Sequence, residues 1–394
     1  MAAIMPEDAL GTLEQLLESE DPSASFDLLI GQFHAAKDYR ALFEARLMRR
    51  RLELRLPLFL ADDLSALSSE ARDAYSQAVT EAAREVGELF LRDGEIAQAW
   101  PYLRATGDSA RVADAIEKVE AGGDVNRIIE IALQEEVHPA KGLELIVAKY
   151  GICQALSAFE VSAVKKDREK CIAVLARTLH TEAVERLGSA IEQKEGSQPD
   201  STNIAELIGG RDWLFGEYSA YVDTSHLVSL LQYCSEVTDA GVLRIYHELC
   251  EYGKRLSPQL RVPCQPPFED VYTDIDHYVM ALLGVDVETH LAHFRGKVVR
   301  AGPEPAESLP AQALVRLLAR LGRYEEALEV ALAHFPHARS ADLTCPAATE
   351  LCQLAGRFDR LKELARQRGD WLSYAAASLE ARTLRVAGEK SVPG

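Results

Sequence analysis

Apolar residues recur at three- and four-residue spacing along almost the whole chain. Leu89, Ile96, Ala99, Trp100 and Leu103 are one example, and four leucines between residues 314 and 321 are another. This spacing places the apolar side chains on one side of an α-helix, which has 3.6 residues per turn. We find no alternating pattern in which β-branched residues gather between turn signals, as paired strands require. The pattern therefore predicts an all-α protein.

Short clusters of glycine, proline and small polar residues divide the helical pattern. They fall at 21–23, 92–94, 122–124 and 302–305, and they leave helices of ordinary length joined by short connections. We therefore expect stacked antiparallel helix pairs, arranged as an α-solenoid.

Two stretches are longer than a simple turn, namely 195–202 and 257–268, the second of which contains four prolines. Proline and small polar residues remove helix propensity and core contacts, so we place a boundary near the first stretch. This gives three predicted segments. They are an N-terminal helical repeat half (1–200), a central segment rich in tyrosine and histidine (201–300) and C-terminal repeats (301–394).

Two segments near the C-terminal end of the chain match each other. LARLGRYEEALEVALAHF is echoed by LCQLAGRFDRLKELARQR, so that Gly322 and Gly356 lie 34 residues apart and Tyr324 is matched by Phe358. This period resembles that of the tetratricopeptide repeat, in which a glycine ends the first helix and an aromatic residue opens the second. The resemblance implies that the two glycines occupy equivalent turns. It also implies that both aromatic rings are buried against their preceding helices.

The segment 80–113 also resembles a repeat, with Gly87 in the first helix, Gly94 at the turn and Ala99 in the second helix. The match is imperfect elsewhere, because larger residues stand where small ones are usual, at Val315, Thr349 and Leu361. Tetratricopeptide-like arrays form a right-handed superhelix. The resemblance therefore implies a curved stack whose concave face holds a protein or peptide partner.

The charge balance limits the classes of partner. The chain has 43 Lys and Arg against 62 Asp and Glu, a formal net charge of −19, which opposes binding to nucleic acid or to anionic lipid. No stretch approaches the run of about 20 apolar residues that spans a bilayer, and residues 1–22 are acidic and amphipathic rather than a basic signal peptide. We therefore expect a cytoplasmic protein with no nucleic-acid or membrane partner.

The cysteines point to the same compartment. The seven cysteines fall at irregular positions without a C-x-x-C pair, and an odd number cannot all form internal disulfides. Reduced and mostly buried thiols are therefore expected.

The central segment differs from the rest of the chain in its aromatic and imidazole content. Residues 213–295 hold half of the histidines and seven tyrosines, which combine large contact areas with hydrogen-bonding tips. They predict either a polar and aromatic binding surface or structural packing. The candidate binding residues are Tyr221, Asp223, His226, Tyr246, His247 and His277. Helix capping alone would explain the aspartate in this set, because it precedes a predicted helix.

A metal site is the alternative reading of the same segment. Histidine and carboxylate pairs one helical turn apart or adjacent suit zinc, manganese or iron. The candidate ligands are His226, His277, His290 and His293, with Asp223 or Asp276 assisting. The sequence contains no H-E-x-x-H motif. These residues therefore define a candidate metal-dependent enzyme only if their side chains converge on one point.

Other signatures of catalysis are absent. The chain has no G-x-S-x-G, no G-x-x-x-x-G-K-[ST] and no glycine-rich dinucleotide motif after a strand, which disfavours serine hydrolysis, nucleotide hydrolysis and hydride transfer. One basic cluster stands out, and it comprises Arg46, Arg49, Arg50, Arg51 and Arg55. It predicts a solvated face, ion pairs with an acidic neighbouring helix, or a contact for an anion or an acidic partner. The preferred function is a non-catalytic scaffold that binds a protein or peptide in its groove, without a cofactor.

Overall fold

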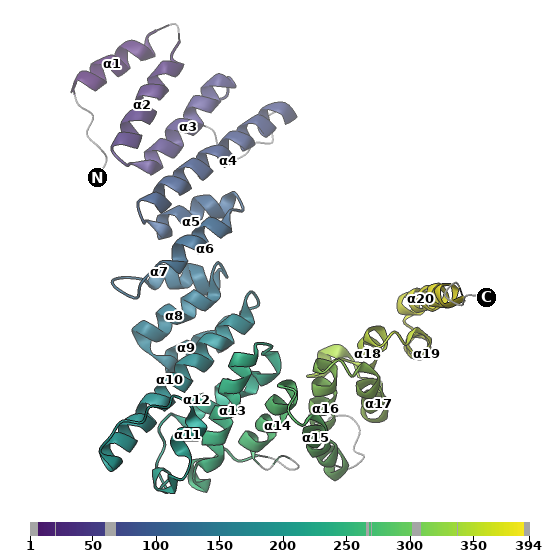
Figure 1. The fold of residues 1–394 in the computed structure, drawn as a ribbon. Coiled ribbons are helices and arrows are strands. Elements are labelled where there is room, and N and C mark those ends of the chain that lie inside the picture. The colour runs from purple at the N-terminus through teal and green to yellow at the C-terminus, as the bar shows by residue number, and fades with distance from the viewer. Residues whose placement is uncertain are drawn as a thin grey trace. The chain divides into compact units, whose positions relative to one another are not determined.

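The structure is a computed structural model, and it describes residues 7–19, 21–59, 68–264, 268, 270–301, 309–336 and 338–389. These residues form α-helices and short 3₁₀ and π turns, and no β-strand occurs among them (Figure 1). The predicted all-α class is confirmed. No helix in the described part of the chain combines the length and the apolar character needed to cross a membrane.

The chain divides into two compact units, 1–171 and 172–394. The first unit contains α1 (Glu7–Leu17), α2 (Ser23–Ala35), α3 (Tyr39–Glu53), α4 (Ser69–Arg92), α5 (Ile96–Ala105), α6 (Ser109–Glu117), α7 (Asn126–Ile129), a π-helical turn (Glu130–Gln134), α8 (Pro139–Tyr150) and α9 (Ile152–Ser162). Helix α10 (Arg168–Glu195) crosses the division. The predicted boundary near residue 200 coincides with the end of α10, and the three-segment division stays a prediction.

The second unit contains shorter elements between longer helices. They are α11 (Ile204–Ile208), η3 (Asp212–Leu214), α12 (Thr224–Leu231), η4 (Gln232–Glu236), α13 (Ala240–Arg255), η5 (Pro258–Leu260), α14 (Val271–Leu282), α15 (Val287–Ala301), α16 (Leu309–Arg320), α17 (Tyr324–His334), η6 (Ser340–Asp342), α18 (Ala348–Leu354), α19 (Phe358–Arg368) and α20 (Trp371–Glu389). The elements labelled η are 3₁₀ helices.

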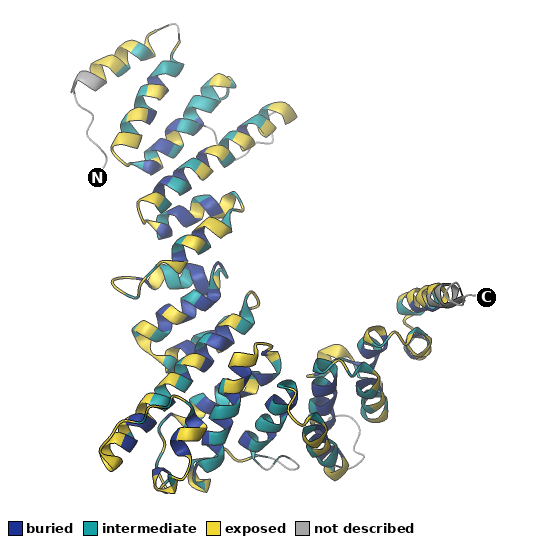
Figure 2. Cartoon of the chain, in the orientation of Figure 1, coloured by how far each residue is buried: buried dark blue, intermediate teal, exposed yellow. Residues whose placement is uncertain are grey.

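Consecutive helices pack against each other within each unit. In the first unit α2 contacts α3, α3 contacts α4 and α4 contacts α5, and in the second unit the same holds from α13 through α20 (Figure 1). Most helices have one buried side and one exposed side, as the dark blue and yellow segments of Figure 2 show. Leu42, Val86, Ala99 and Leu103, from three helices of the first unit, are completely shielded from solvent. The fold therefore depends mainly on contacts between neighbours in sequence, with further contacts such as those of α11 with α13 and of α14 with α16.

The predicted breaks fall between helices wherever the structure describes them. Residues 21–23 separate α1 from α2, 92–94 separate α4 from α5, and 122–124 lie between α6 and α7. The break predicted at 302–305 lies outside the described residues, as do Pro266 and Pro267 of the proline-rich stretch. The stretch at 195–202 joins α10 to α11 and is non-helical after its first residue, as expected.

The two glycines of the 34-residue repeat occupy equivalent turns, which confirms the prediction. Gly322 and Gly356 have φ angles of 74° and 67°, in the left-handed region that favours glycine. The N–H of the residue that follows each glycine donates to a carbonyl five residues back, at 2.9 Å for Arg323 and 2.7 Å for Arg357. This 6→1 hydrogen bond closes the preceding helix as in a Schellman motif.

The same turn recurs in the first unit at Gly94, where φ is 81° and the N–H of Glu95 donates to the carbonyl of Phe90 at 2.9 Å. It also recurs after α2, where Lys37 adopts a φ of 56° and the N–H of Asp38 donates to the carbonyl of Phe33 at 2.9 Å. One local turn geometry therefore connects helices in both units.

The two aromatic residues of the repeat are less enclosed than the resemblance implied. Tyr324 and Phe358 are both half-buried rather than buried. The larger residues at the imperfect positions are accommodated, since Val315 is fully buried and Leu361 is 3% exposed, whereas Thr349 is half-buried. The packing of the repeat thus tolerates apolar side chains where tetratricopeptide repeats usually have small ones.

Close approach of two helices explains two of the helical glycines. A Cβ atom placed on Gly87 would lie 2.5 Å from Cγ of Leu103, so α4 and α5 meet without space for a side chain. A Cβ atom on Gly253 would lie 2.2 Å from a ring carbon of Tyr272, whose side chain is fully buried. A buried ring cannot move aside easily, so α13 and α14 pack this closely only with glycine at position 253.

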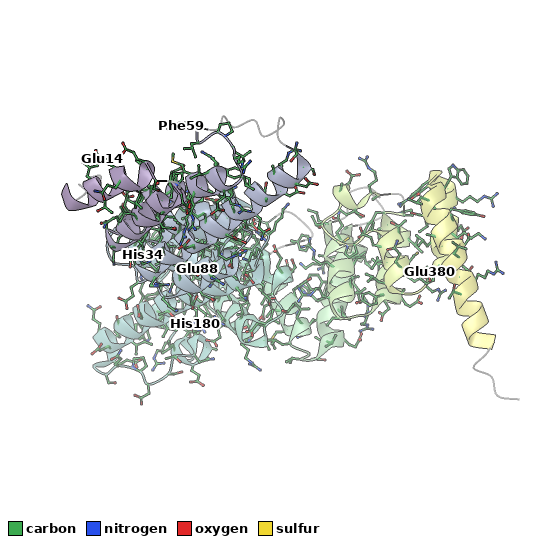
Figure 3. The ribbon with its side chains drawn as sticks, turned by 90° about the horizontal axis from the view of Figure 1, so that it is seen from above. Glu14, His34, Phe59, Glu88, His180 and Glu380 are labelled. Carbon is green, nitrogen blue, oxygen red and sulfur yellow. The ribbon has the colours of Figure 1, made fainter. Side chains whose placement is uncertain are left out.

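The cysteines follow the predicted pattern. All seven are free, and five of them are buried, whereas Cys153 is exposed and Cys264 is half-buried. In the second unit, a polar contact joins three helices, because Glu248 of α13 accepts from Nε2 of His180 on α10 at 2.9 Å and from the N–H of Ile204 at the start of α11 at 2.8 Å. His180 is labelled in Figure 3.

The Gly253 contact predicts an unusual response to alanine. Gly253→Ala is expected to lower the free energy of unfolding by about 1–3 kcal/mol, because the clash with the Tyr272 ring outweighs the helix propensity of alanine. The matched control is Gly31→Ala in α2, where nothing lies within 4 Å of the added Cβ. That change is expected to stabilise by about 0.5–1 kcal/mol. Urea unfolding followed by circular dichroism measures both, and equal effects would contradict the close packing.

Candidate functional site

The tyrosines predicted for the central binding surface serve the core of the second unit. Tyr246 is fully buried, and its hydroxyl donates to the carbonyl of Leu230 at 3.0 Å. Tyr221 is half-buried, its hydroxyl donates to the carbonyl of Leu214 at 3.1 Å, and its N–H donates to the hydroxyl of Tyr252 at 2.7 Å. A partner can reach part of Tyr221 in this conformation but not the ring of Tyr246.

Asp223 is the N-cap of α12. Its carboxylate accepts from the N–H of Ser225 at 2.8 Å and from the Ser225 hydroxyl at 2.6 Å, and these bonds lower the pKa of the carboxyl. His226 follows in the first turn of α12 and is half-buried. The capping explanation of Asp223 is therefore confirmed, and a binding role for either residue stays a prediction.

Helix α14 carries a carboxylate that bonds to α13. Asp276 accepts from Nδ1 of His247 at 2.6 Å and from Nζ of Lys254 at 3.0 Å. The hydrogen bond to Asp276 raises the pKa of His247. Burial alone would raise the pKa of Asp276, but the bonds to His247 and Lys254 outweigh it and lower that pKa. The group is therefore an ion-pair network between two neighbouring helices.

The same network contains the one set of potential metal ligands that the described residues bring together. One ligand atom each from His247, Glu251 and Asp276 lie within 4.8 Å of one another. Nζ of Lys254 bonds to both carboxylates of this set, so an ammonium group already supplies the positive charge there. A metal ion would have to displace the ammonium group of Lys254 and break the hydrogen bond between His247 and Asp276, and both requirements oppose binding.

A second carboxylate of α14 bonds to α15. Oδ1 of Asp274 accepts from Nε2 of His293 at 2.7 Å and from Nζ of Lys297 at 2.9 Å. The side chains of Asp274 and Lys297 are only 10% and 3% exposed, and Oδ2 of Asp274 is buried without a hydrogen bond. Nζ of Lys297 also lies 5.3 Å from the centroid of the Phe268 ring. The pair is a buried charge pair rather than a surface contact.

Three of the predicted metal ligands gather between α14 and α15. The ring of His277 stacks on that of His293 with centroids 3.8 Å apart, and its Nδ1 lies 2.7 Å from Nδ1 of His290. Burial, followed by the nearby His293 and His290, lowers the pKa of His277 to about 4. Two nitrogens at 2.7 Å need one proton between them, so the rings hydrogen-bond to each other.

The predicted metal set thus meets only in part. His277, His290 and His293 are neighbours, but in the described residues they do not provide three ligand atoms within 4.8 Å, and His226 lies on α12. His247 and Asp276 do belong to such a set, and sequence reasoning had assigned Asp276 only an assisting role. Glu251, four residues after His247 on α13, is the ligand that it missed, although the spacing of one helical turn was visible in the sequence.

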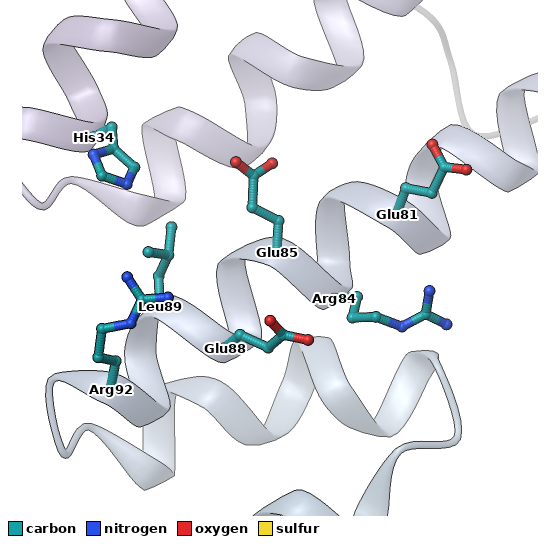
Figure 4. Close-up of a pocket in the computed structure, with 7 residues that line it drawn as sticks. All are labelled: His34, Glu81, Arg84, Glu85, Glu88, Leu89 and Arg92. Atoms are coloured by element: carbon teal, nitrogen blue, oxygen red, sulfur yellow. The ribbon is translucent and has the colours of Figure 1, made fainter.

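A hollow of about 400 Å³ lies in the first unit between α2 and α4. Its lining residues are His34, Glu81, Arg84, Glu85, Glu88, Leu89 and Arg92. Figure 4 shows His34 on α2 and the other six side chains on α4, and Figure 3 places His34 and Glu88 in the whole chain. Six of the seven residues are charged or titratable, so the hollow is lined mainly by polar groups. We refer to it as the α2–α4 hollow.

The charges of the α2–α4 hollow are unequally satisfied. The carboxylate of Glu85 accepts two hydrogen bonds from Arg46, at 2.9 and 2.7 Å, and Glu88 pairs with Arg111. Arg84 and Arg92 are exposed, and neither guanidinium forms a hydrogen bond or ion pair with another described residue. The hollow therefore presents two available cations, eight residues or about 12 Å apart along α4.

Four of the five arginines of the cluster found in the sequence have internal partners. Arg46 pairs with Glu85 of α4, Arg49 pairs with Asp27 of α2, and Arg50 pairs with Glu53 of its own helix. Arg51 donates to the hydroxyl of Tyr75 at 2.8 Å. The expectation of ion pairs with acidic neighbouring helices is confirmed for Arg46 and Arg49.

The chain matches no protein-family model, no curated protein and no solved structure. Its class therefore rests on the fold, which is that of an all-α protein whose consecutive helices pack against their neighbours, compatible with a helical-repeat fold.

Removal of one member of the buried pair of Asp274 and Lys297 is predicted to lower stability strongly, and removal of the second member to restore part of it. Lys297→Met is expected to lower the free energy of unfolding by about 3–5 kcal/mol, because it leaves a buried carboxylate without its ammonium partner. The double variant Asp274→Asn with Lys297→Met is expected to regain more than half of that loss. Chemical unfolding of the wild type and the variants measures these free energies of unfolding. Arg339→Met, at an exposed pair with Asp342, serves as control and is expected to cost less than about 1 kcal/mol.

The low pKa of His277 predicts a loss of stability in acid. The ordinary pKa of 6.5 applies in the unfolded chain, whereas the folded protein keeps His277 neutral down to about pH 4. The contribution of neutral His277 to the free energy of unfolding is complete above pH 6.5 and is lost as the pH falls from 6.5 towards 4. Thermal unfolding of His277→Gln should therefore depend less on pH in this range than that of the wild type.

A second histidine with the opposite shift and one control variant accompany the pH experiment. His247 has a raised pKa, so its contribution has the opposite sign: it is complete below pH 6.5 and is lost as the pH rises through the folded pKa. His34→Gln makes the same substitution at an exposed histidine of the first unit and serves as the control for the change of side chain. An acid profile of His277→Gln that overlays the wild type would contradict the assignment.

Proposed function

We propose that the protein is a non-catalytic helical-repeat scaffold that binds an acidic segment of a protein or peptide partner. The proposal includes the finer architecture expected from the sequence, namely antiparallel helix pairs stacked as a tetratricopeptide-like α-solenoid with a right-handed superhelix. The 34-residue period and the identical turns at Gly322 and Gly356 support that architecture.

The observation that carries the binding proposal is the α2–α4 hollow with its two available guanidinium groups. An arginine is a common energetic centre of an interface, because its planar group binds carboxylates through two parallel hydrogen bonds. The carboxylates of Glu85 and Glu88 already have arginine partners, so they compete little for Arg84 and Arg92. A segment with acidic residues about 12 Å apart fits this pair of cations.

The Tyr- and His-rich segment of the second unit is a separate surface that we propose for partner binding. Tyr221, His226 and His277 are half-buried and so expose part of their rings. The partner proposed for the scaffold is a protein or peptide, in the cytoplasm, and neither nucleic acid nor membrane. The net charge of −19 supports the exclusion of nucleic acid and anionic lipid.

Peptides selected from a display library for binding to the 394-residue chain test this function. We expect them to be rich in Asp and Glu, and we expect Arg84→Glu with Arg92→Glu to weaken their binding at least tenfold, because repulsion replaces two charge-assisted hydrogen bonds. Isothermal titration calorimetry measures the affinity. Arg40→Glu is the matched control, since it changes the charge of an exposed arginine on α3 that does not line the hollow.

The controls decide between a specific contact and a general effect of charge. An equal loss of affinity in Arg40→Glu would indicate non-specific attraction, and unchanged binding in the double variant would exclude the hollow. Peptides that bind instead through Tyr221, His226 or His277 would lose affinity on substitution of these residues by Ala while keeping their melting temperature. That outcome would move the site to the central segment and keep the scaffold function.

A second candidate function is a helical metal-dependent enzyme, which the set of His247, Glu251 and Asp276 favours. Imidazole and carboxylate ligands suit zinc. Because Lys254 neutralises both carboxylates, zinc should bind only weakly to the wild-type chain and more tightly to Lys254→Met. Calorimetric titration of both proteins with zinc, with His247→Ala as control, tests this candidate independently of peptide binding.

A further inference from the structure

Helix α20 exposes an apolar stripe to solvent. Leu372 and Leu379 are 83% and 66% exposed, and Ala375 and Ala376 between them are exposed as well. These four residues share one side of the helix because they lie three, four and seven residues apart. Figure 2 shows the exposed residues along α20, and Figure 3 labels Glu380 on the same helix.

The opposite side of α20 is the side that the fold uses. Ala377 and Ala381 are 1% and 7% exposed, and α20 packs against α19. In α16, by contrast, the three leucines after the first residue, Leu314, Leu317 and Leu318, are at most 2% exposed. Helix α20 therefore has two apolar sides, and only one of them is covered by the described residues. An exposed apolar stripe of this kind marks a contact surface.

The order of the residues in the stripe identifies what covers it. Leu372, Ala375, Ala376 and Leu379 read the same in both directions, with spacings of three, one and three. A two-fold axis between Ala375 and Ala376 would place each leucine opposite a leucine and each alanine opposite an alanine of an antiparallel copy. Self-complementary surfaces of this type are what a two-fold symmetric dimer requires. The central alanines allow a short distance of about 8 Å between the helix axes.

The side chains that flank the stripe are compatible with the same symmetry. Trp371 and Arg382 lie eleven residues apart, or three turns, on one edge of the stripe. In the antiparallel pair Arg382 of one copy lies near Trp371 of the other, where a guanidinium favours the face of an indole ring. Glu380, on the other edge, lies near Ser373 of the second copy. No two like charges of the described side chains oppose each other across the axis.

We propose that α20 is a dimerisation helix that pairs with α20 of a second copy of this chain, antiparallel and about a two-fold axis. The contact spans about three turns of one helix from each copy, so its area is at or below the roughly 1,200 Å² at which stable interfaces begin. The dimer is therefore weak, with a dissociation constant on the order of micromolar, and it forms reversibly.

Disulfide trapping on the full-length chain tests the geometry. The variant Ala375→Cys places two sulfurs one residue, or about 1.5 Å, apart along the helix axes of the pair, within reach of a disulfide. The matched control Thr383→Cys lies on the same stripe, but its two copies are separated by fifteen residues, or about 22 Å. Both are made with Cys153→Ser, which removes the exposed thiol, and both are oxidised with copper phenanthroline.

We expect Ala375→Cys to form a covalent dimer within minutes. In the same time Thr383→Cys should form at least tenfold less covalent dimer. Sedimentation equilibrium of the untrapped chain should show a reversible monomer–dimer equilibrium. Leu372→Glu with Leu379→Glu should weaken the dimer at least tenfold, whereas Val161→Glu with Val299→Glu, at positions 86% and 80% exposed, should leave it unchanged. These substitutions are at exposed sites, and circular dichroism verifies that both variants stay folded.

Three results would overturn the proposal. The first is a chain that stays monomeric at protein concentrations up to about 100 times the expected dissociation constant. This result is also expected if a different protein covers the stripe. The second is equal trapping at positions 375 and 383, which would indicate random collision or a parallel pair. The third is a dimer that survives Leu372→Glu with Leu379→Glu, which would place the interface elsewhere.

Discussion

The fold depends on the burial of each helix's apolar stripe against the helix that precedes or follows it in the chain. Single amphipathic helices of this length are marginal in water, so packing supplies most of their stability. The contact is tightest where a glycine removes the side chain between two helices, as at Gly87 against Leu103 and at Gly253 against Tyr272. The recurring turn at Gly94, Gly322 and Gly356 then joins one helix to the next with the same backbone geometry.

This dependence on neighbours explains where polar groups are buried. Helix α14 packs against α13 on one side and against α15 on the other, and it carries a carboxylate towards each of them. Asp276 bonds to His247 and Lys254, and Asp274 bonds to His293 and Lys297. A buried carboxylate is tolerated only with a charged partner and hydrogen bonds, so these networks fix the pairing of α14 with its neighbours at a cost in desolvation. They include two of the five histidines of residues 213–295, His247 and His293.

The surfaces proposed for binding are those where local pairing is incomplete. In the α2–α4 hollow, Arg84 and Arg92 form no hydrogen bond or ion pair with another described residue. On α20, leucines remain exposed although the opposite side of the helix is packed. The first surface has charge to offer an acidic segment, and the second has apolar area to offer an identical helix, so the two support different interactions.

The sequence by itself determined the all-α class, the positions of the described helix breaks and the turns of the 34-residue repeat. These features depend on residues close in the chain, because helix periodicity, capping at Asp223 and the φ angles at Gly322 and Gly356 are local properties. Tertiary structure decided which polar side chains meet. Whether Asp276 pairs with His247, whether His277 stacks on His293, and whether Tyr246 is buried depend on how two helices are rotated about their axes and how closely they approach. That rotation is set by the packing of many side chains from different helices, so neither the spacing nor the composition of a single segment could specify it.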